Sequence, residues 1–164
     1  MKIIITDLKK LNLPIEGEYR IISPNDRADI KNCIGCFGCW MKTPGKCVIH
    51  DGFESTGGYL GSCSELIFIS RCSYGSLSPF VKSVLDRAIS YVHPNFVKRN
   101  GEMHHKRRYD NVIALRAYFY GDNITEDEKE TARNIMTANI INFDGVMKEI
   151  AFFKSPEELE GITV

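Results

Sequence analysis

Several features are scarce or absent in this 164-residue chain. No apolar run approaches the ~20 residues that span a bilayer, and no small-residue cleavage site follows the short start MKIIITDLKK. Lys plus Arg and Asp plus Glu each number 21, so no net field draws the protein to nucleic acid or to an anionic membrane surface. We therefore expect a cytoplasmic protein whose partners are small molecules or other proteins, not nucleic acid or membranes.

The chain also lacks internal repeats, low-complexity tracts and an interdomain linker. Its length suits one domain over residues 1–164, large enough to bury a core without disulfides or metals. Six cysteines are present, and four of them are clustered, which favours metal binding or redox chemistry over disulfides. Cys63 and Cys72 stand apart, on either side of an expected buried strand.

Short apolar and β-branched runs predict the strands. We expect them at residues 2–6, 18–22, 65–70, 111–117 and 145–153. About a dozen residues separate the first two runs, and Pro14 interrupts them, so a full-length helix does not fit there. The first βα unit is therefore expected to be shortened.

Start signals predict three helices. Ser78 and Pro79 supply an N-cap and a first-turn proline, and the apolar spacing that follows predicts a helix ending near Pro94. A capping-box pattern recurs twice, predicting one helix to about Asn139 and a short C-terminal helix: Thr125 with Glu128, and Ser155 with Glu158.

Two segments read as loops. Residues 32–51 are rich in Cys and Gly and are expected to be organised around the cysteines. Residues 95–110 are basic and are expected to form a solvated, mobile loop in preference to a phosphate or nucleic-acid patch; they contain Lys98, Arg99, His104, His105, Lys106, Arg107 and Arg108.

The alternation of strands and helices predicts an α/β fold with a mostly parallel sheet covered on both faces. In such sheets ligands bind outside the carboxyl ends of the strands. The loops after Thr6, Ser70 and Ala117 are therefore the candidate ligand-binding loops.

The cysteine cluster has the spacing C-x2-C-x2-C-x7-C, formed by Cys33, Cys36, Cys39 and Cys47. Compact runs of four cysteines are typical of cubane iron-sulfur clusters, whereas zinc ribbons more often use two separated C-x2-C pairs. The spacing favours a [4Fe-4S] cluster over zinc. Four reduced thiols without metal are the alternative, and a Cys36–Cys39 pair that cycles through a disulfide is a weaker one.

The chain resembles the NADPH-dependent FMN reductase family of the flavodoxin-like fold, especially its iron-sulfur flavoprotein branch. The resemblance covers residues 32–87 and rests on CIGCFGCW with KTPGKCVIHD, then on SYGSLSPFVKSVLDR after an apolar strand. It implies a flavodoxin-like doubly wound parallel sheet. The family's first loop usually carries a Gly-Ser-Pro-Arg type segment for the FMN phosphate; TDLKKLNLPIEGE here lacks that glycine and hydroxyl density.

The resemblance also implies which residues contact FMN. The loop after the third strand wraps the flavin in such proteins, and its counterparts are Cys72, Ser73, Tyr74, Gly75 and Ser76; without the family, these form an ordinary strand-to-helix turn. Arg71 could supply a positive charge for a phosphate or pair with a surface carboxylate. A third flavin-lining loop would contain Arg116, Tyr118, Tyr120 and Gly121, and the alternative is a surface loop with amphipathic tyrosines.

These expectations favour a flavin-dependent redox protein with bound FMN. Its electrons would come from NAD(P)H or from a protein donor, and hydride transfer through a flavin needs no general acid or base of the protein. Relatives usually associate, so the resemblance implies a homodimer. The alternative is a degenerate flavodoxin-fold member without flavin, acting as an interaction or metal-binding module.

Overall fold

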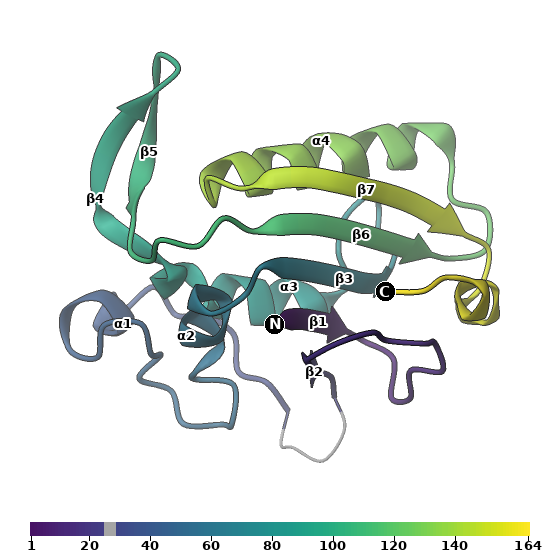
Figure 1. Cartoon of the computed structure of the whole chain (residues 1–164), viewed down its shortest axis with the longest axis horizontal. Helices are drawn as coiled ribbons and strands as arrows, with labels where there is room; N and C mark the ends of the chain where they lie inside the picture. The colour runs from purple at the N-terminus through teal and green to yellow at the C-terminus, as the bar shows by residue number, and fades with distance from the viewer. Residues whose placement is uncertain (25–28) are drawn as a thin grey trace.

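The computed structural model describes residues 1–24 and 29–164 (Figure 1). Its strands are β1 (Lys2–Thr6), β2 (Tyr19–Ile22), β3 (Glu65–Arg71), β4 (Val92–Arg99), β5 (Glu102–Arg107), β6 (Ala114–Tyr120) and β7 (Val146–Phe153). Its α-helices are α1 (Gly38–Met41), α2 (Thr56–Gly61), α3 (Pro79–Arg87) and α4 (Glu126–Asn142). Two 3-10 helices complete the order, η1 (Ile89–Tyr91) and η2 (Pro156–Gly161).

Five strands form one parallel sheet in the order β2-β1-β3-β6-β7. This is the strand order of the flavodoxin-like doubly wound sheet, with its switch point between β1 and β3. The predicted flavodoxin-like α/β fold is therefore confirmed. The predicted strands all exist, although the fourth begins at Ala114 and extends to Tyr120.

The two faces of the sheet are covered differently. Helices α2, α3 and α4 pack on one face and enclose the larger core, which contains Ile3, Ile5, Leu66, Phe68, Leu115, Ala117 and Phe119 from the strands. The opposite face carries Ile4, Ile67, Ile69 and Tyr118, and it is covered by the loop after β1 and by the C-terminal segment with Leu159 and Val164. Residues 7–18 contain no helix, as their length predicts. The expected cover on both faces is therefore confirmed, although on this second face it comes from irregular segments and the short helix η2, which contains Leu159.

The basic segment 95–110 is not a loop, which corrects the sequence-based expectation. Strands β4 and β5 pair antiparallel as a hairpin that stands apart from the main sheet in Figure 1. Asn100 and Gly101 both have positive φ at its turn, 50° and 89°. Asn-Gly is the preferred pair for such a turn, because both positions require positive φ. The signal was present in the sequence but was outweighed by the polar composition.

The end of α3 and the cap of the C-terminal helix also differ from the expectation. Helix α3 begins at Pro79 as predicted but ends at Arg87, and η1 and β4 take up the residues that were expected to continue it to Pro94. The second capping box does not form: Ser155 makes no side-chain cap bond, and Glu158 accepts the backbone N–H of Lys154 at 2.8 Å. The expected short C-terminal helix is nevertheless present as the 3-10 helix η2.

The first capping box is confirmed. Thr125 Oγ1 accepts a hydrogen bond from the N–H of Glu128 at 3.2 Å, and the Glu128 carboxylate accepts one from the N–H of Thr125 at 2.9 Å. This exchange fixes the start of α4, which packs against β7 (Figure 1). Within residues 1–24 and 29–164, no helix combines the length and the apolar character needed to cross a membrane.

Candidate functional site

The carboxyl ends of three neighbouring strands meet at one carboxylate. Asp7 follows β1 directly, and its side chain accepts the backbone N–H of Arg71 at 3.1 Å and the phenol of Tyr120 at 3.0 Å. Burial raises the pKa of Tyr120, and the negative charge of Asp7 raises it further. Tyr120 therefore stays protonated as a donor, and Asp7 ties the ends of β1, β3 and β6 together.

The loop after β3 is a tight turn built from its own backbone. Ser73 and Ser76 exchange two backbone hydrogen bonds of 2.9 Å, and the two residues between them have positive φ, 52° at Tyr74 and 74° at Gly75. A Cβ at Gly75 would lie 2.7 Å from Thr131 Cβ and 2.8 Å from a backbone oxygen of α4. Only glycine permits this approach, and the turn leaves Tyr74 94% exposed.

This turn and Asp7 border a cavity of about 480 Å³. Its lining residues are Asp7, Arg71, Cys72, Ser73, Tyr74, Ser78, Pro79, Phe80 and Glu128. The exposed guanidinium of Arg71 has no hydrogen-bond or ion-pair partner among the described residues, so the alternative of a surface ion pair has no support there. The hydroxyl of Ser78 is buried and likewise without a partner in the described part of the chain. The cavity thus offers a cation, an unused hydroxyl and an exposed aromatic ring.

The predicted third loop is placed differently. Arg116 and Tyr118 lie within β6, not after it. The Arg116 guanidinium bonds to Glu65 and Glu149, and the Tyr118 hydroxyl donates to Glu149 at 2.8 Å. Glu65 begins the strand that Arg71 ends, and a strand of seven residues spans roughly 20 Å. Arg116 is therefore engaged at the opposite end of the sheet from the cavity, whereas Tyr120 reaches the cavity through Asp7.

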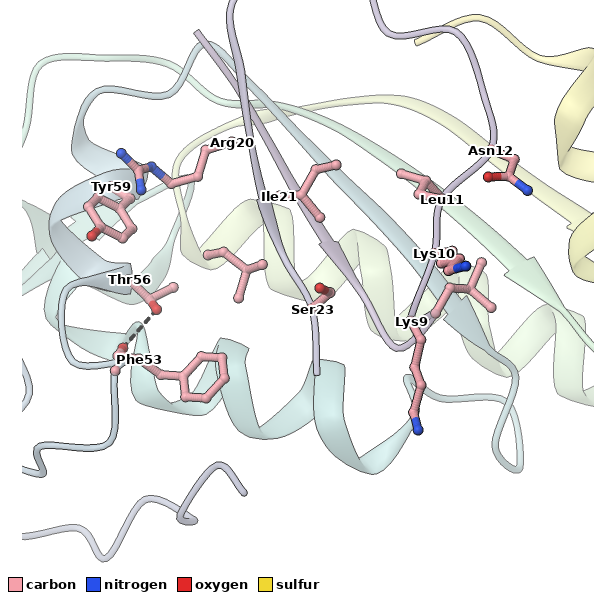
Figure 2. Close-up of a pocket in the computed structure, with 13 residues that line it drawn as sticks. Lys9, Lys10, Leu11, Asn12, Arg20, Ile21, Ser23, Phe53, Thr56 and Tyr59 are labelled. Carbon is pink, nitrogen blue, oxygen red and sulfur yellow. Dashed lines mark hydrogen bonds between the residues drawn. The ribbon is translucent and has the colours of Figure 1, made fainter. Parts of the chain in front are cut away.

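A larger cavity of about 590 Å³ lies at the β2 edge of the sheet (Figure 2). Figure 2 shows Arg20 and Tyr59 at one side, with the guanidinium 4.2 Å from the ring centroid, and Lys9 and Lys10 at the other. No described residue of its lining is Asp or Glu. The cavity is therefore electropositive, and Lys9 and Lys10 belong to the loop that follows β1, next to Asp7.

The cysteine loop, residues 31–51, presents its thiols unequally. Cys33 and Cys36 are exposed, whereas Cys39 and Cys47 are buried. All four line one largely apolar cavity of about 440 Å³, together with Trp40 and residues of α3 and α4. Burial raises the pKa of Cys39, and the nearby Cys47, Cys33 and Cys36 add to the shift. Among the described residues, however, no three His, Cys, Asp or Glu side chains are grouped as a metal site, so this geometry does not support the cluster.

One buried side chain holds the cysteine loop against α3. Arg87 is 1% exposed, and all five of its N–H groups donate. Their acceptors are Cys47 Sγ, the backbone oxygens of Lys31 and Ile49, and both carboxylate oxygens of Asp51. Burial alone would raise the pKa of Asp51, but the bonds from Arg87 and from two backbone N–H groups outweigh it and lower the pKa to about 2. Asp51 is therefore ionised near neutral pH.

Comparison with known proteins supports the fold. A similar solved structure is the FMN-dependent NADH-azoreductase from Bacillus anthracis str. Ames Ancestor in complex with FMN, with a TM-score of 0.53 and 11% sequence identity. The match covers 93% of this chain and 85% of that chain. The fold is flavodoxin-like. No family model matches the chain, and no curated protein matches it.

Four residues that organise these sites were not assigned these roles from the sequence. Asp7 could have been found from its place directly after a buried strand, where ligand-binding loops begin. Ser78 was recognised only as a helix N-cap, although its side chain makes no cap bond. The network of Arg87 and Asp51 joins residues 36 positions apart, and no local pattern indicates it.

Proposed function

We propose that this protein is a flavin-dependent oxidoreductase that binds FMN at the carboxyl ends of β1, β3 and β6. The observation that carries the proposal is the cavity beside the turn at residues 72–76. It combines an exposed aromatic ring with a hydroxyl and a guanidinium that have no partner among residues 1–24 and 29–164. The structurally similar azoreductase was solved with FMN and is described as NADH-dependent, which favours the same classes of cofactor and electron donor here.

The cavity suits the ring system of a flavin. Its volume of about 480 Å³ falls within the usual range for small-molecule sites of about 300–1,000 Å³. Tyr74 offers an aromatic wall, and Ser78 offers a hydroxyl that can bond to a ring oxygen or nitrogen. The first backbone N–H groups of α3, like those of any helix, point out of its N-terminal end towards the residues that precede it. A bound flavin would supply hydride acceptance and electron transfer.

The phosphate of FMN requires a different solution from the usual helix N-terminus. Residues 7–18 contain no helix, so no helix dipole follows β1. Lys9 and Lys10 occupy that loop, and the adjoining cavity has no described carboxylate in its lining. We infer that these two ammonium groups, with Arg71, provide the positive charge for the phosphate. Side chains would thus replace the backbone cradle.

The electron donor in this proposal is NAD(P)H or a redox protein. No nucleic acid and no membrane takes part, in keeping with the balanced charge of the chain. All six cysteines are free in the structure, and free thiols persist in a reducing compartment, so we propose a cytoplasmic location. Asp7 keeps the three strand ends and the Tyr120 proton in place while the electron donor leaves the cavity and the electron acceptor enters it.

The test is a pair of titrations of the purified protein with FMN and with riboflavin, followed by flavin and Trp40 fluorescence. We expect saturable binding of FMN. The variant Lys9→Met/Lys10→Met should weaken FMN binding by about tenfold or more and leave riboflavin binding unchanged, because only FMN carries the phosphate. The matched control is Lys148→Met, a lysine of β7 that lines neither cavity. A protein that binds neither flavin contradicts the proposal.

A second candidate function is an interaction or metal-binding module without flavin. It is favoured by the missing helix between β1 and β2 and by the four thiols that line one cavity. The [4Fe-4S] cluster stays a prediction, and we derive no step through it because the thiols are not grouped as a metal site in the described residues. Anaerobic purification with assays of iron, zinc and flavin separates the candidates: flavin without metal supports the first, and metal without flavin the second.

A further inference from the structure

The β4–β5 hairpin is a two-stranded sheet on its own. Val97 pairs with His104, and Lys98 with Met103, up to the turn at residues 100–101. Figure 1 shows the hairpin projecting beyond the main sheet. A two-stranded sheet is only marginally stable in water, and three or more strands or packing on a helix are needed to stabilise it. The contacts of each face of the hairpin therefore decide what completes it.

One face of the hairpin is anchored to the end of α4. Arg99 forms an ion pair with Asp144 and donates to the backbone oxygen of Ile141 at 3.2 Å. His104 is 8% exposed and lies 3.3 Å from the side chain of Asn142. Because residues two apart in a strand share a face, Val97 lies on this anchored side with Arg99. The hairpin is thus held at its base and along one side.

The outer edge of β4 is open. Residues 95–98 are four successive exposed positions of this strand. Only β5 pairs with β4 among the described strands. Phe96 is 62% exposed although its ring stacks on His105 at 4.7 Å, and Met103 is 65% exposed. An open edge with exposed apolar side chains is a template for another strand.

The edge can accept only a short partner strand. Pro94 lacks an N–H, and the register shifts between Val92 and Phe96. At the other end, the turn begins after Arg99, whose guanidinium is committed to Asp144. The usable segment is therefore 95–99, with Val97 at its centre. A segment this short favours a pair of two strands, one from each of two chains, over a continuing array of strands from many chains.

We propose that β4 pairs antiparallel with β4 of a second copy of this chain, around a twofold axis at Val97. This register sets Val97 against the partner's Val97, Phe96 against the partner's Lys98, and Asn95 against the partner's Arg99. No two like charges are directly opposite, and an ammonium group meets an aromatic ring at each side. The segment is thus complementary to itself, which singles out a second copy as the occupant. The two hairpins then form one four-stranded sheet.

This interface is independent of flavin binding, since it shares no residue with either cavity proposed for FMN. Its centre makes it testable by charge exchange. Val97→Lys and Val97→Glu each place like charges opposite one another across the twofold axis, and both variants should be monomers under conditions in which the unaltered protein is a dimer. Mixing the two in equal amounts should restore a dimer, because lysine then faces glutamate.

Sedimentation velocity over a wide range of protein concentrations measures these states, and thermal unfolding verifies that each variant is folded. Val146→Lys is the matched control: Val146 is 50% exposed at the start of β7, the far edge strand of the main sheet, and the dimer should persist. A protein that is monomeric at every concentration overturns the proposal. So does a dimer that survives either Val97 variant, or a pair of monomeric variants whose mixture stays monomeric.

Discussion

The turn after β3 and the cysteine loop are both irregular segments beside α3, but they are held in opposite ways. Backbone bonds and a glycine fix the turn, and its side chains Arg71 and Tyr74 remain exposed. A single buried side chain, Arg87, fixes the cysteine loop and engages the thiol of Cys47. Side chains that do no structural work are free to bind a ligand. By this criterion the turn is a site prepared for a ligand, whereas the cysteine loop already uses part of its donor set for folding.

The largest expected effect comes from breaking the Arg87 network. Arg87→Met leaves Asp51, whose side chain is 2% exposed, without its ionic partner. Removing one member of a buried pair costs about 3–5 kcal/mol of unfolding free energy. The control on the same helix is Lys82→Met, which removes an exposed pair with Asp86 and should cost only about 0–1 kcal/mol. Urea unfolding measures both, and equal losses would refute the assigned role.

The turn should be sensitive at its backbone. Gly75→Ala combines a positive φ with a Cβ 2.8 Å from a backbone oxygen of α4, so we expect a loss of about 2–3 kcal/mol and much weaker FMN binding. Gly101→Ala has a similar φ, 89°, but nothing within 4 Å of its Cβ, and should cost only about 1 kcal/mol. The difference between the two variants in thermal unfolding isolates the close approach to α4. If both variants lose the same unfolding free energy, the close approach of residue 75 to α4 does not contribute to the cost.

The Asp51 carboxylate should give the cysteine loop a pH dependence at the acid end. Its pKa is lowered from 3.8 to about 2 by the folded environment, so folding is favoured by the ionised form. The resulting stabilisation, about 2 kcal/mol, is fully present above pH ~5 and is lost as the pH falls through about 4 towards 2. In Asp51→Asn this part of the decline in unfolding free energy should vanish. An unchanged acid limb in the variant would show that other groups cause it.

The smallest effect on stability is expected at Tyr74. Its side chain is 94% exposed, so Tyr74→Ala should change the unfolding free energy by less than about 0.5 kcal/mol. FMN binding should nevertheless weaken by about tenfold if the ring is a wall of the flavin site. Parallel urea and fluorescence titrations separate the two properties. A variant with unaltered FMN affinity would remove Tyr74 from the proposed site.

Local signals in the sequence were enough to predict the elements that are stabilised by residues close together in the chain. The β-branched run at residues 2–6, the apolar strand at 65–70 and the capping box of Thr125 and Glu128 are all present in the structure. The hairpin at 92–107 was missed because its strands are polar and basic, and its Asn100-Gly101 turn was the only strong signal. The end of α3 was missed because Pro94 is a weaker guide than the turn that follows Arg87.

By itself, the sequence determined the existence of the five strands, the shortened first unit and the cysteine spacing, because periodicity, segment length and spacing are properties of the chain. The flavodoxin-like order of the strands was implied by the family resemblance and is shown by the structure. Only the tertiary structure decided that Asp7 joins three strand ends, that Arg116 serves the opposite end of the sheet, and that Arg87 bonds to Cys47. These outcomes depend on contacts between residues 40 to 113 positions apart. Such contacts form only when the sheet and its helices pack, and no local pattern specifies them.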